Sequence, residues 1–210
     1  AYDRGTGRKI GSINQGSGTS PTILGSGKYV TYTDNADDRI AIIVAHTGDV
    51  PDGQERQICR VPVFASGGSA TDNSMIGYDR SIILENNHGF TNAIQHKDYT
   101  SVTGGVVRVD VRVDESGCDI IWESDLKVPS VVPKLSLGNG IAYFYSFDLL
   151  DNGDRLWSLV GLGFETGKEV VRISTGTGVA YIINWASIAI APNGDSYVGT
   201  RQGFLKVENP

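Results

Sequence analysis

Long apolar runs, basic charge and cysteine are what this sequence has least of. No apolar run approaches the roughly 18 residues that a membrane-spanning helix needs. The formal net charge is −6, whereas a protein that binds a phosphate backbone needs a basic face. We therefore expect no membrane span and no nucleic-acid partner.

The chain has two cysteines, Cys59 and Cys118, and each stands beside an alternating apolar run. One interpretation is a disulfide between neighbouring units of a secreted or periplasmic protein. The other is a pair of buried free thiols, which cysteine tolerates well. The chain starts without methionine and without a signal peptide, which favours a mature, trimmed or fragmentary chain.

Helical periodicity is also missing, and short strand-like runs take its place. One run, "VVRVDVRVD", alternates strictly: Val107, Val109 and Val111 share one face, and Arg108 and Asp110 share the other, predicted to be wet. Gly-rich and Asn-Gly turns such as "GSGK", "LGNG", "DNGD" and "PNGD" separate such runs, which is a strong hairpin signal. The sequence predicts an all-β sandwich, barrel or propeller.

A degenerate repeat decides between these architectures. Four segments share an apolar residue, a polar turn and a short strand; they start at Leu24, Ile76, Leu135 and Ile190, at intervals of 52, 59 and 55 residues. Such a period, with about four strands per unit, indicates a β-propeller with about four four-stranded blades. The expected units within a single domain, residues 1–210, are 15–65, 66–128, 129–175, and 176–210 plus 1–14.

The opening stretch "AYDRGTGRKI" reads as the outer hairpin of a blade whose inner strands lie elsewhere. One alternative pairs residues 1–14 with Gly203–Val207, so that the two chain ends share a blade and close the ring. The other makes the chain a fragment of a ring of six to eight blades, with the remaining blades as its partner. The missing initiator methionine favours the fragment.

The same hairpin carries a family resemblance. Ala1, Asp3, Thr6, Gly7 and Arg8 follow the pattern Ala-x-Asp-x-x-Thr-Gly-[Lys/Arg], and the stretch from Leu162 to Lys168 follows it loosely. This pattern resembles the repeat of quinoprotein-like propellers, the superfamily of pyrroloquinoline-quinone dehydrogenases, in which a tryptophan such as Trp122 often closes the motif. The quinone enzymes use adjacent half-cystines, and this chain has none. The resemblance therefore implies the fold rather than the activity.

Two polar clusters follow inner-strand runs in consecutive units, where a propeller funnel would lie. Asp34 and Asn35 stand in the first, and Glu85, Asn86 and Asn87 in the second. Carboxylate and amide oxygens are ligands of calcium, so Asp34, Asn35 and Glu85 are candidate metal ligands and Ca²⁺ is the candidate cofactor. Capping of hairpin tips by Asp and Asn explains the same residues without a metal.

Further candidates concern catalysis and organic ligands. Glu85 and His88 are candidate catalytic groups, with the histidine as general base, although a solvated loop histidine is the alternative. Asn86 and Asn87, together with Asn184 and Trp185, are candidate ligand-binding residues; inter-blade packing is the alternative for the tryptophan. A long loop, residues 88–105, is a candidate lid or partner surface.

We therefore expect an extracellular or periplasmic propeller that serves as a ligand-binding or scaffold module for a small-molecule or protein ligand. The rival hypothesis is an enzyme with its site in the propeller funnel. That enzyme is either a calcium-dependent, lactonase-type hydrolase or a dehydrogenase related to the quinoproteins.

Overall fold

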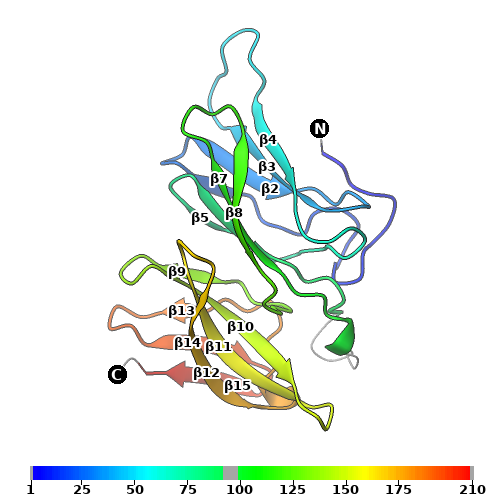
Figure 1. Ribbon diagram of the computed structural model, residues 1–210, viewed down its shortest axis with the longest axis vertical. Coiled ribbons are helices and arrows are strands. Elements are labelled where there is room, and N and C mark those ends of the chain that lie inside the picture. The colour runs from blue at the N-terminus through cyan, green and yellow to red at the C-terminus, as the bar shows by residue number, and fades with distance from the viewer. Residues whose placement is uncertain (1, 92–98, 209–210) are drawn as a thin grey trace.

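The computed structural model describes residues 2–91 and 99–208, which form four antiparallel sheets (Figure 1). We call them blades 1 to 4 in chain order. Blade 1 comprises β1 (Thr22–Leu24), β2 (Tyr29–Thr33), β3 (Ala41–His46) and β4 (Gln57–Pro62). Blade 2 comprises β5 (Ile76–Tyr78), β6 (Ser81–Glu85), β7 (Val106–Val111) and β8 (Cys118–Ser124).

Blade 3 comprises β9 (Lys134–Ser136), β10 (Ile141–Leu149), β11 (Arg155–Gly163) and β12 (Glu169–Thr177). Blade 4 has three strands among the described residues: β13 (Ala189–Ile190), β14 (Ser196–Thr200) and β15 (Gly203–Val207). Two three-residue 3₁₀ turns, η1 (Tyr99–Ser101) and η2 (Val179–Tyr181), are the helical content of the described ranges.

The predicted turns join the strands of each blade. Asn152-Gly153 connects β10 to β11, and Asn193-Gly194 connects β13 to β14. Both glycines have positive φ, 79° and 88°, a region that residues with a Cβ atom rarely occupy. Local turn chemistry thus sets the up-and-down strand order within each blade.

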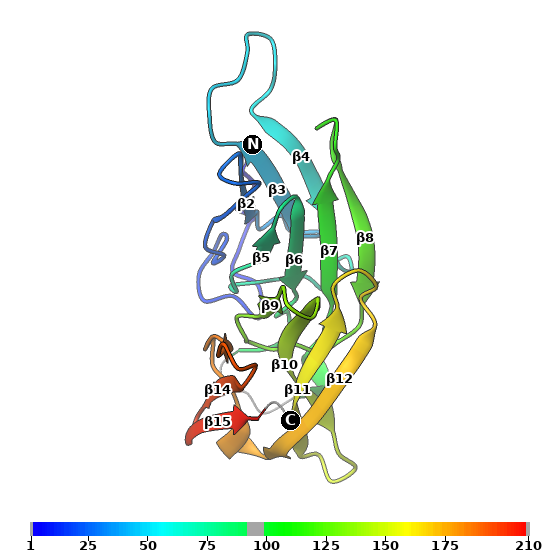
Figure 2. The ribbon, with the colours of Figure 1, turned by 90° about the vertical axis from the view of Figure 1, so that its left-hand side faces the viewer.

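The blades stand side by side in sequence order. The outer strands β4, β8 and β12 run along one side of the molecule (Figure 2), and blades 1 and 4 lie at opposite ends of the row (Figure 1). Each sheet is a consecutive up-and-down meander. The predicted all-β class and propeller-blade architecture are confirmed, and the described residues form an open arc of four blades. No helix among them is long and apolar enough to cross a membrane.

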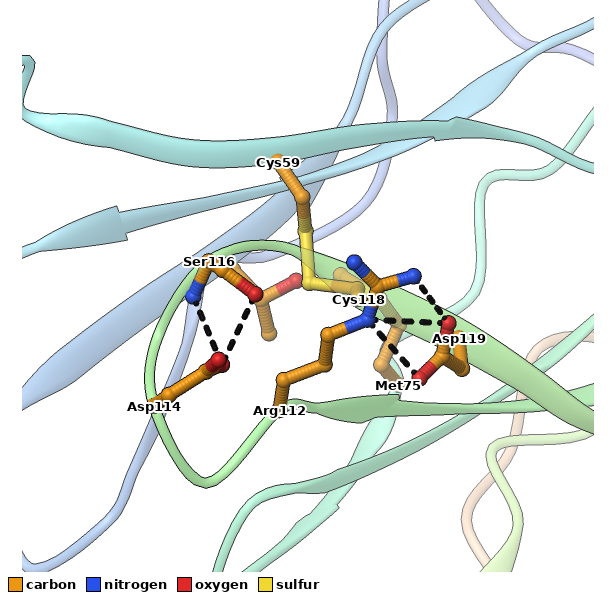
Figure 3. The surroundings of a disulfide bond; sticks show 8 residues. Cys59, Met75, Arg112, Asp114, Ser116, Cys118 and Asp119 are labelled. Atoms are coloured by element: carbon orange, nitrogen blue, oxygen red, sulfur yellow. Dashed lines mark hydrogen bonds and ion pairs between the residues drawn. A yellow bond between two sulfur atoms is a disulfide. The ribbon is translucent and has the colours of Figure 1, made fainter.

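Blades 1 and 2 bury a shared apolar core and are joined covalently. Ile42 and Val44 of β3 pack with Val107 and Val109 of β7, all fully buried. At the outer edge, Figure 3 shows the disulfide between Cys59 on β4 and Cys118 on β8, with Cα atoms 5.9 Å apart. The ion pair of Arg112 and Asp119 lies beside it (Figure 3). The two cysteines therefore form the predicted disulfide between neighbouring units.

The predicted wet face of β7 is wrong at Arg108. Its side chain is only 7% exposed, because blade 3 covers this side of the sheet. The guanidinium pairs with Asp110 and Glu165, donates to the carbonyl oxygen of Phe164 at 2.9 Å and lies 3.9 Å from the Phe164 ring centroid. A blade inside a propeller has neighbours on both faces, so strict alternation does not identify a solvent face.

The Thr-Gly turn of blade 3 also packs against blade 2. Trp122 of β8 donates its indole N–H to the carbonyl oxygen of Phe164 at 2.8 Å. Gly167 lies directly against the indole, since a Cβ atom there would come 2.5 Å from a ring carbon. The tryptophan that the family resemblance pointed to is thus a contact between blades.

Blades 3 and 4 share a buried apolar cluster, and their two entry connectors are hydrogen-bonded. The cluster includes Tyr145 of β10 and Trp157 of β11, whose rings are stacked within blade 3 with centroids 5.6 Å apart, and Val198 of β14 in blade 4. Ser130, in the connector that enters blade 3, donates to the carbonyl oxygen of Ile183, in the connector that enters blade 4, at 2.9 Å. Each blade is therefore packed against the next one in the sequence.

The N-terminal residues differ from the expected pairing with Gly203–Val207. Residues 3–13, which we call the strap, form no strand and instead cross the ends of β2 and β6. A Cβ atom on Gly5 would come 2.4 Å from the carbonyl oxygen of Asn35. The glycine therefore permits close approach of two backbones, and the Thr-Gly pattern forms no hairpin here.

Candidate functional site

Asp34 follows β2, is 1% exposed, and has both carboxylate oxygens engaged. Its Oδ2 atom accepts hydrogen bonds from Arg60, with Nη2 at 2.7 Å and Nε at 2.8 Å. Its Oδ1 atom accepts from the backbone N–H groups of Ala41 at 2.8 Å and Ala36 at 3.3 Å. The carboxylate therefore closes the loop between β2 and β3.

Asn35 holds the strap. Its backbone N–H donates to the carbonyl oxygen of Asp3 at 2.7 Å, and its Nδ2 donates to those of Arg4 at 2.9 Å and Gly7 at 3.3 Å. Asp37 adds a further bond, because its Oδ1 accepts the N–H of Thr6 at 2.8 Å. Hydrogen bonds to Asn35 and Asp37 therefore hold this segment in place of the predicted strand pairing with Gly203–Val207.

Asn86 occupies in blade 2 the place that Asp34 occupies in blade 1, directly after the second strand. Its Oδ1 accepts the N–H groups of Ala70 and His88, both at 3.1 Å. Its Nδ2 donates to the carbonyl oxygens of Gly68 and Gly104, both at 2.8 Å. Two donors and two acceptors satisfy the amide group, so it serves the loops of its own blade.

Asn87, the next residue, joins two connectors. Its Oδ1 accepts from the hydroxyl of Thr71 at 3.1 Å and the N–H of Asp72 at 3.0 Å. Its Nδ2 donates to the carbonyl oxygens of Val128 at 3.3 Å and Pro129 at 3.1 Å. This side chain, 0% exposed, therefore links the entry to blade 2 with the entry to blade 3.

Glu85 ends β6 and is fully buried at 0% exposure. Among the described residues, neither carboxyl oxygen has a hydrogen-bond partner, and the same holds for both side-chain polar atoms of Asn73. Burial raises the pKa of Glu85 well above its ordinary value of 4.5, and the neighbouring Asn73 amide lowers it in part. In blade 1 the matching pair is Thr19 and Thr33, whose hydroxyl oxygens are 2.8 Å apart.

His88 lies on the loop after Asn87 and is partly buried. Its Nδ1 atom is 2.9 Å from the hydroxyl oxygen of Thr103. Burial lowers the pKa of His88, and the charge of Lys9 lowers it further. The imidazole is therefore mainly neutral at pH 7, while the carboxyl of Glu85, its proposed catalytic companion, is enclosed in the protein.

The donor set predicted for calcium does not fit that ion. Calcium takes six to eight oxygen ligands, whereas Asp34 is neutralised by Arg60 and Glu85 is fully buried. The described residues contain no group of three or more His, Cys, Asp or Glu side chains arranged to hold a metal ion. Capping of loops, the alternative interpretation, agrees with the contacts of Asp34 and Asn86.

A cleft of about 380 Å³ lies between the strap and the connector that enters blade 4. Arg8, Lys9, Ile10, Gly11, Ser12 and Ile13 form its strap side, and Thr91 and Trp185 line the rest. We call it the strap cleft. Thr91 is the last described residue before 92–98, so the central part of the predicted lid lies outside the described residues.

Trp185 is the predicted ligand-binding residue that lines the strap cleft. Its φ angle is +53°, which is a rare and strained conformation for a bulky residue. The ring is partly buried and lies 6.0 Å from the ring of Phe90. Asn184, its predicted companion, is exposed and is not part of the lining.

The strap itself is what sequence reasoning missed. Gly11 was a usable signal, since its φ is +103° and a Cβ atom there would come 2.3 Å from the carbonyl oxygen of Asn87. The N–H of Gly89 donates to the carbonyl oxygen of Ile10 at 3.2 Å. The glycines at positions 5 and 11 thus allow the strap backbone to lie directly on the loops that contain Asn35 and Asn87.

The chain was also compared with known proteins. No protein-family model matches it, and no curated protein matches it. Among solved structures it is similar to BamB from Moraxella catarrhalis, with 11% sequence identity, a TM-score of 0.41, and coverage of 99% of this chain and 71% of that one. A likeness at this TM-score identifies neither a family nor a function, and the fold assignment rests on the blades themselves.

Proposed function

We propose that this protein is an extracellular or periplasmic propeller module that binds a ligand through the strap cleft and does not catalyse a reaction. The observation that carries the proposal is the use of polar side chains. The side chains of Asp34, Asn86 and Asn87 form hydrogen bonds within the protein, and that of Glu85 is fully buried. The strap cleft, by contrast, is lined by the aromatic residue Trp185 and the cationic residues Arg8 and Lys9.

The disulfide supports the compartment. Disulfides persist in oxidising environments and are rare in the cytosol. We expect Cys59 and Cys118 to resist alkylation when the protein is isolated from its source with no reductant, and to be labelled after reduction. Labelling of both thiols before reduction would contradict the proposed compartment.

Ligand binding is tested by a thermal-shift screen with sugars, amino acids and carboxylic acids. We expect at least one compound to raise the melting temperature of the wild-type protein, since a ligand that binds only the folded state stabilises it. The same compound should not stabilise Trp185→Asn, because asparagine tolerates positive φ but lacks the indole. Equal stabilisation of both proteins would place binding elsewhere, and no stabiliser at all would contradict the function.

Calcium provides a separate test against the enzyme hypothesis. Because the donor set does not fit the ion, millimolar calcium should leave the melting temperature unchanged relative to a chelator. A clear rise would return Asp34, Asn35 and Glu85 to the status of metal ligands. A matched titration of Asp34→Asn would then locate the ion.

A further inference from the structure

Two polar atoms of the strap cleft lining lack a partner among the described residues. They are the hydroxyl oxygen of Ser12 and the indole nitrogen of Trp185. Buried hydroxyl and N–H groups are nearly always hydrogen-bonded in folded proteins. Ser12 and Trp185 thus line the cleft while these two polar atoms are themselves buried from solvent.

The two cationic side chains of the cleft differ in their charge environment. Lys9 donates to the carbonyl oxygen of Ala36, and its charge is balanced by the nearby carboxylates of Asp3, Asp34, Asp37 and Asp38. Arg8 forms no ion pair within residues 2–91 and 99–208, and its Nη1 atom reaches only the carbonyl oxygen of Ile13 at 3.5 Å. Arg8 is thus the cation with donors to spare.

We infer that the strap cleft takes a sugar ring that carries one carboxylate, that is, a hexuronate. This inference rests on the proposed ligand-binding function and names its ligand class. The guanidinium of Arg8 matches a carboxylate with two parallel hydrogen bonds. The apolar face of a sugar ring matches the indole of Trp185, which lines the cleft.

A monocarboxylate suits the surroundings better than a phosphate. The chain has a net charge of −6, and four aspartates already surround the neighbouring Lys9. A dianion meets stronger repulsion from these carboxylates than a monoanion does, while it gains only one unpaired guanidinium. Phosphate is therefore the informative anionic control.

Tryptophan fluorescence reads this cleft selectively. Of the three tryptophans, Trp122 and Trp157 are 8% and 0% exposed and lie between blades, while Trp185 lines the cleft. The probe is galacturonate, with galactose and inorganic phosphate as controls. We expect saturable quenching by galacturonate, weaker binding of galactose by tenfold or more, and no saturable change with phosphate.

Variants assign the binding to named residues. Arg8→Gln should weaken galacturonate binding about tenfold or more and leave galactose unaffected. Arg4→Gln is the matched control, because Arg4 lies on the same strap but does not line the cleft, and it should bind like the wild type. Trp185→Asn should abolish the fluorescence change, and calorimetry on the same variant should show lost binding.

The outcomes separate this inference from the function on which it rests. Galactose or phosphate binding as tightly as galacturonate would overturn the ligand class. Another stabiliser found in the screen, with no galacturonate binding, would also overturn the ligand class and leave the function standing. Unchanged galacturonate binding in Arg8→Gln would overturn the assigned carboxylate site.

Discussion

The disulfide between Cys59 and Cys118 should be a major source of stability for blades 1 and 2. The two cysteines are 59 residues apart in the chain. In the chain-entropy model, a loop of that length loses about 14 cal/mol/K in the unfolded state, which corresponds to about 4 kcal/mol at 25 °C. We expect the double variant Cys59→Ser/Cys118→Ser to lose about 2–4 kcal/mol of unfolding free energy, because measured values fall at or below the model value.

Urea denaturation followed by fluorescence measures this loss. The variant should unfold at lower urea with a slope no smaller than that of the wild type, since a chain without the cross-link exposes more surface. Dithiothreitol should destabilise the wild type to the level of the variant and leave the variant unchanged. Unfolding free energies of the wild type and the variant that agree within about 0.5 kcal/mol would refute the reasoning.

Three further predictions concern single residues. The unfolding free energy should fall by about 1.4 kcal/mol per pH unit as pH rises from 4.5 towards the raised folded-state pKa of Glu85, because the unfolded chain loses that proton first. In pH-dependent urea melts, Glu85→Gln should remove this slope and should match the wild type below pH 4.5. Arg108→Ala should lower the free energy of unfolding by about 3 kcal/mol, since it leaves the carboxylate of Asp110 without its partner. A loss under 1 kcal/mol in the same melts would refute a role for Arg108 in joining blades 2 and 3. Gly167→Ala should lower the free energy of unfolding by about 2 kcal/mol more than Gly140→Ala does. The φ angles of the two glycines are similar, +64° and +67°, but only a Cβ atom at Gly167 meets the Trp122 ring. Equal losses in the two variants would contradict that packing.

The strands and their turns could be predicted from the sequence because both depend on neighbouring residues. The pair Asn152-Gly153 encodes a hairpin wherever it stands between apolar runs. The spacing of Leu24, Ile76 and Leu135 likewise revealed the blades. Arg108 could not be placed, since its period-2 pattern is the same whether water or another blade covers that face.

The sequence placed the candidate residues along the chain but did not assign their roles. Asp34 directly follows the second strand of blade 1, and Asn86 and Asn87 follow the second strand of blade 2. Their role depends on which donors and acceptors the loops bring to them, and these come from residues up to 42 positions away. Oxygen-rich side chains in a turn bind loops or ions with the same chemistry, so composition alone does not separate the two.

Sequence by itself determined that this protein is a row of small antiparallel sheets, because turn preference and side-chain alternation act over a few residues. Only the tertiary structure decided that Cys59 meets Cys118, that Glu85 is enclosed, and that the strap forms a cleft with Trp185. Each of those outcomes joins segments that are distant along the chain. Their proximity is set by how the blades stack, and no local pattern encodes that stacking.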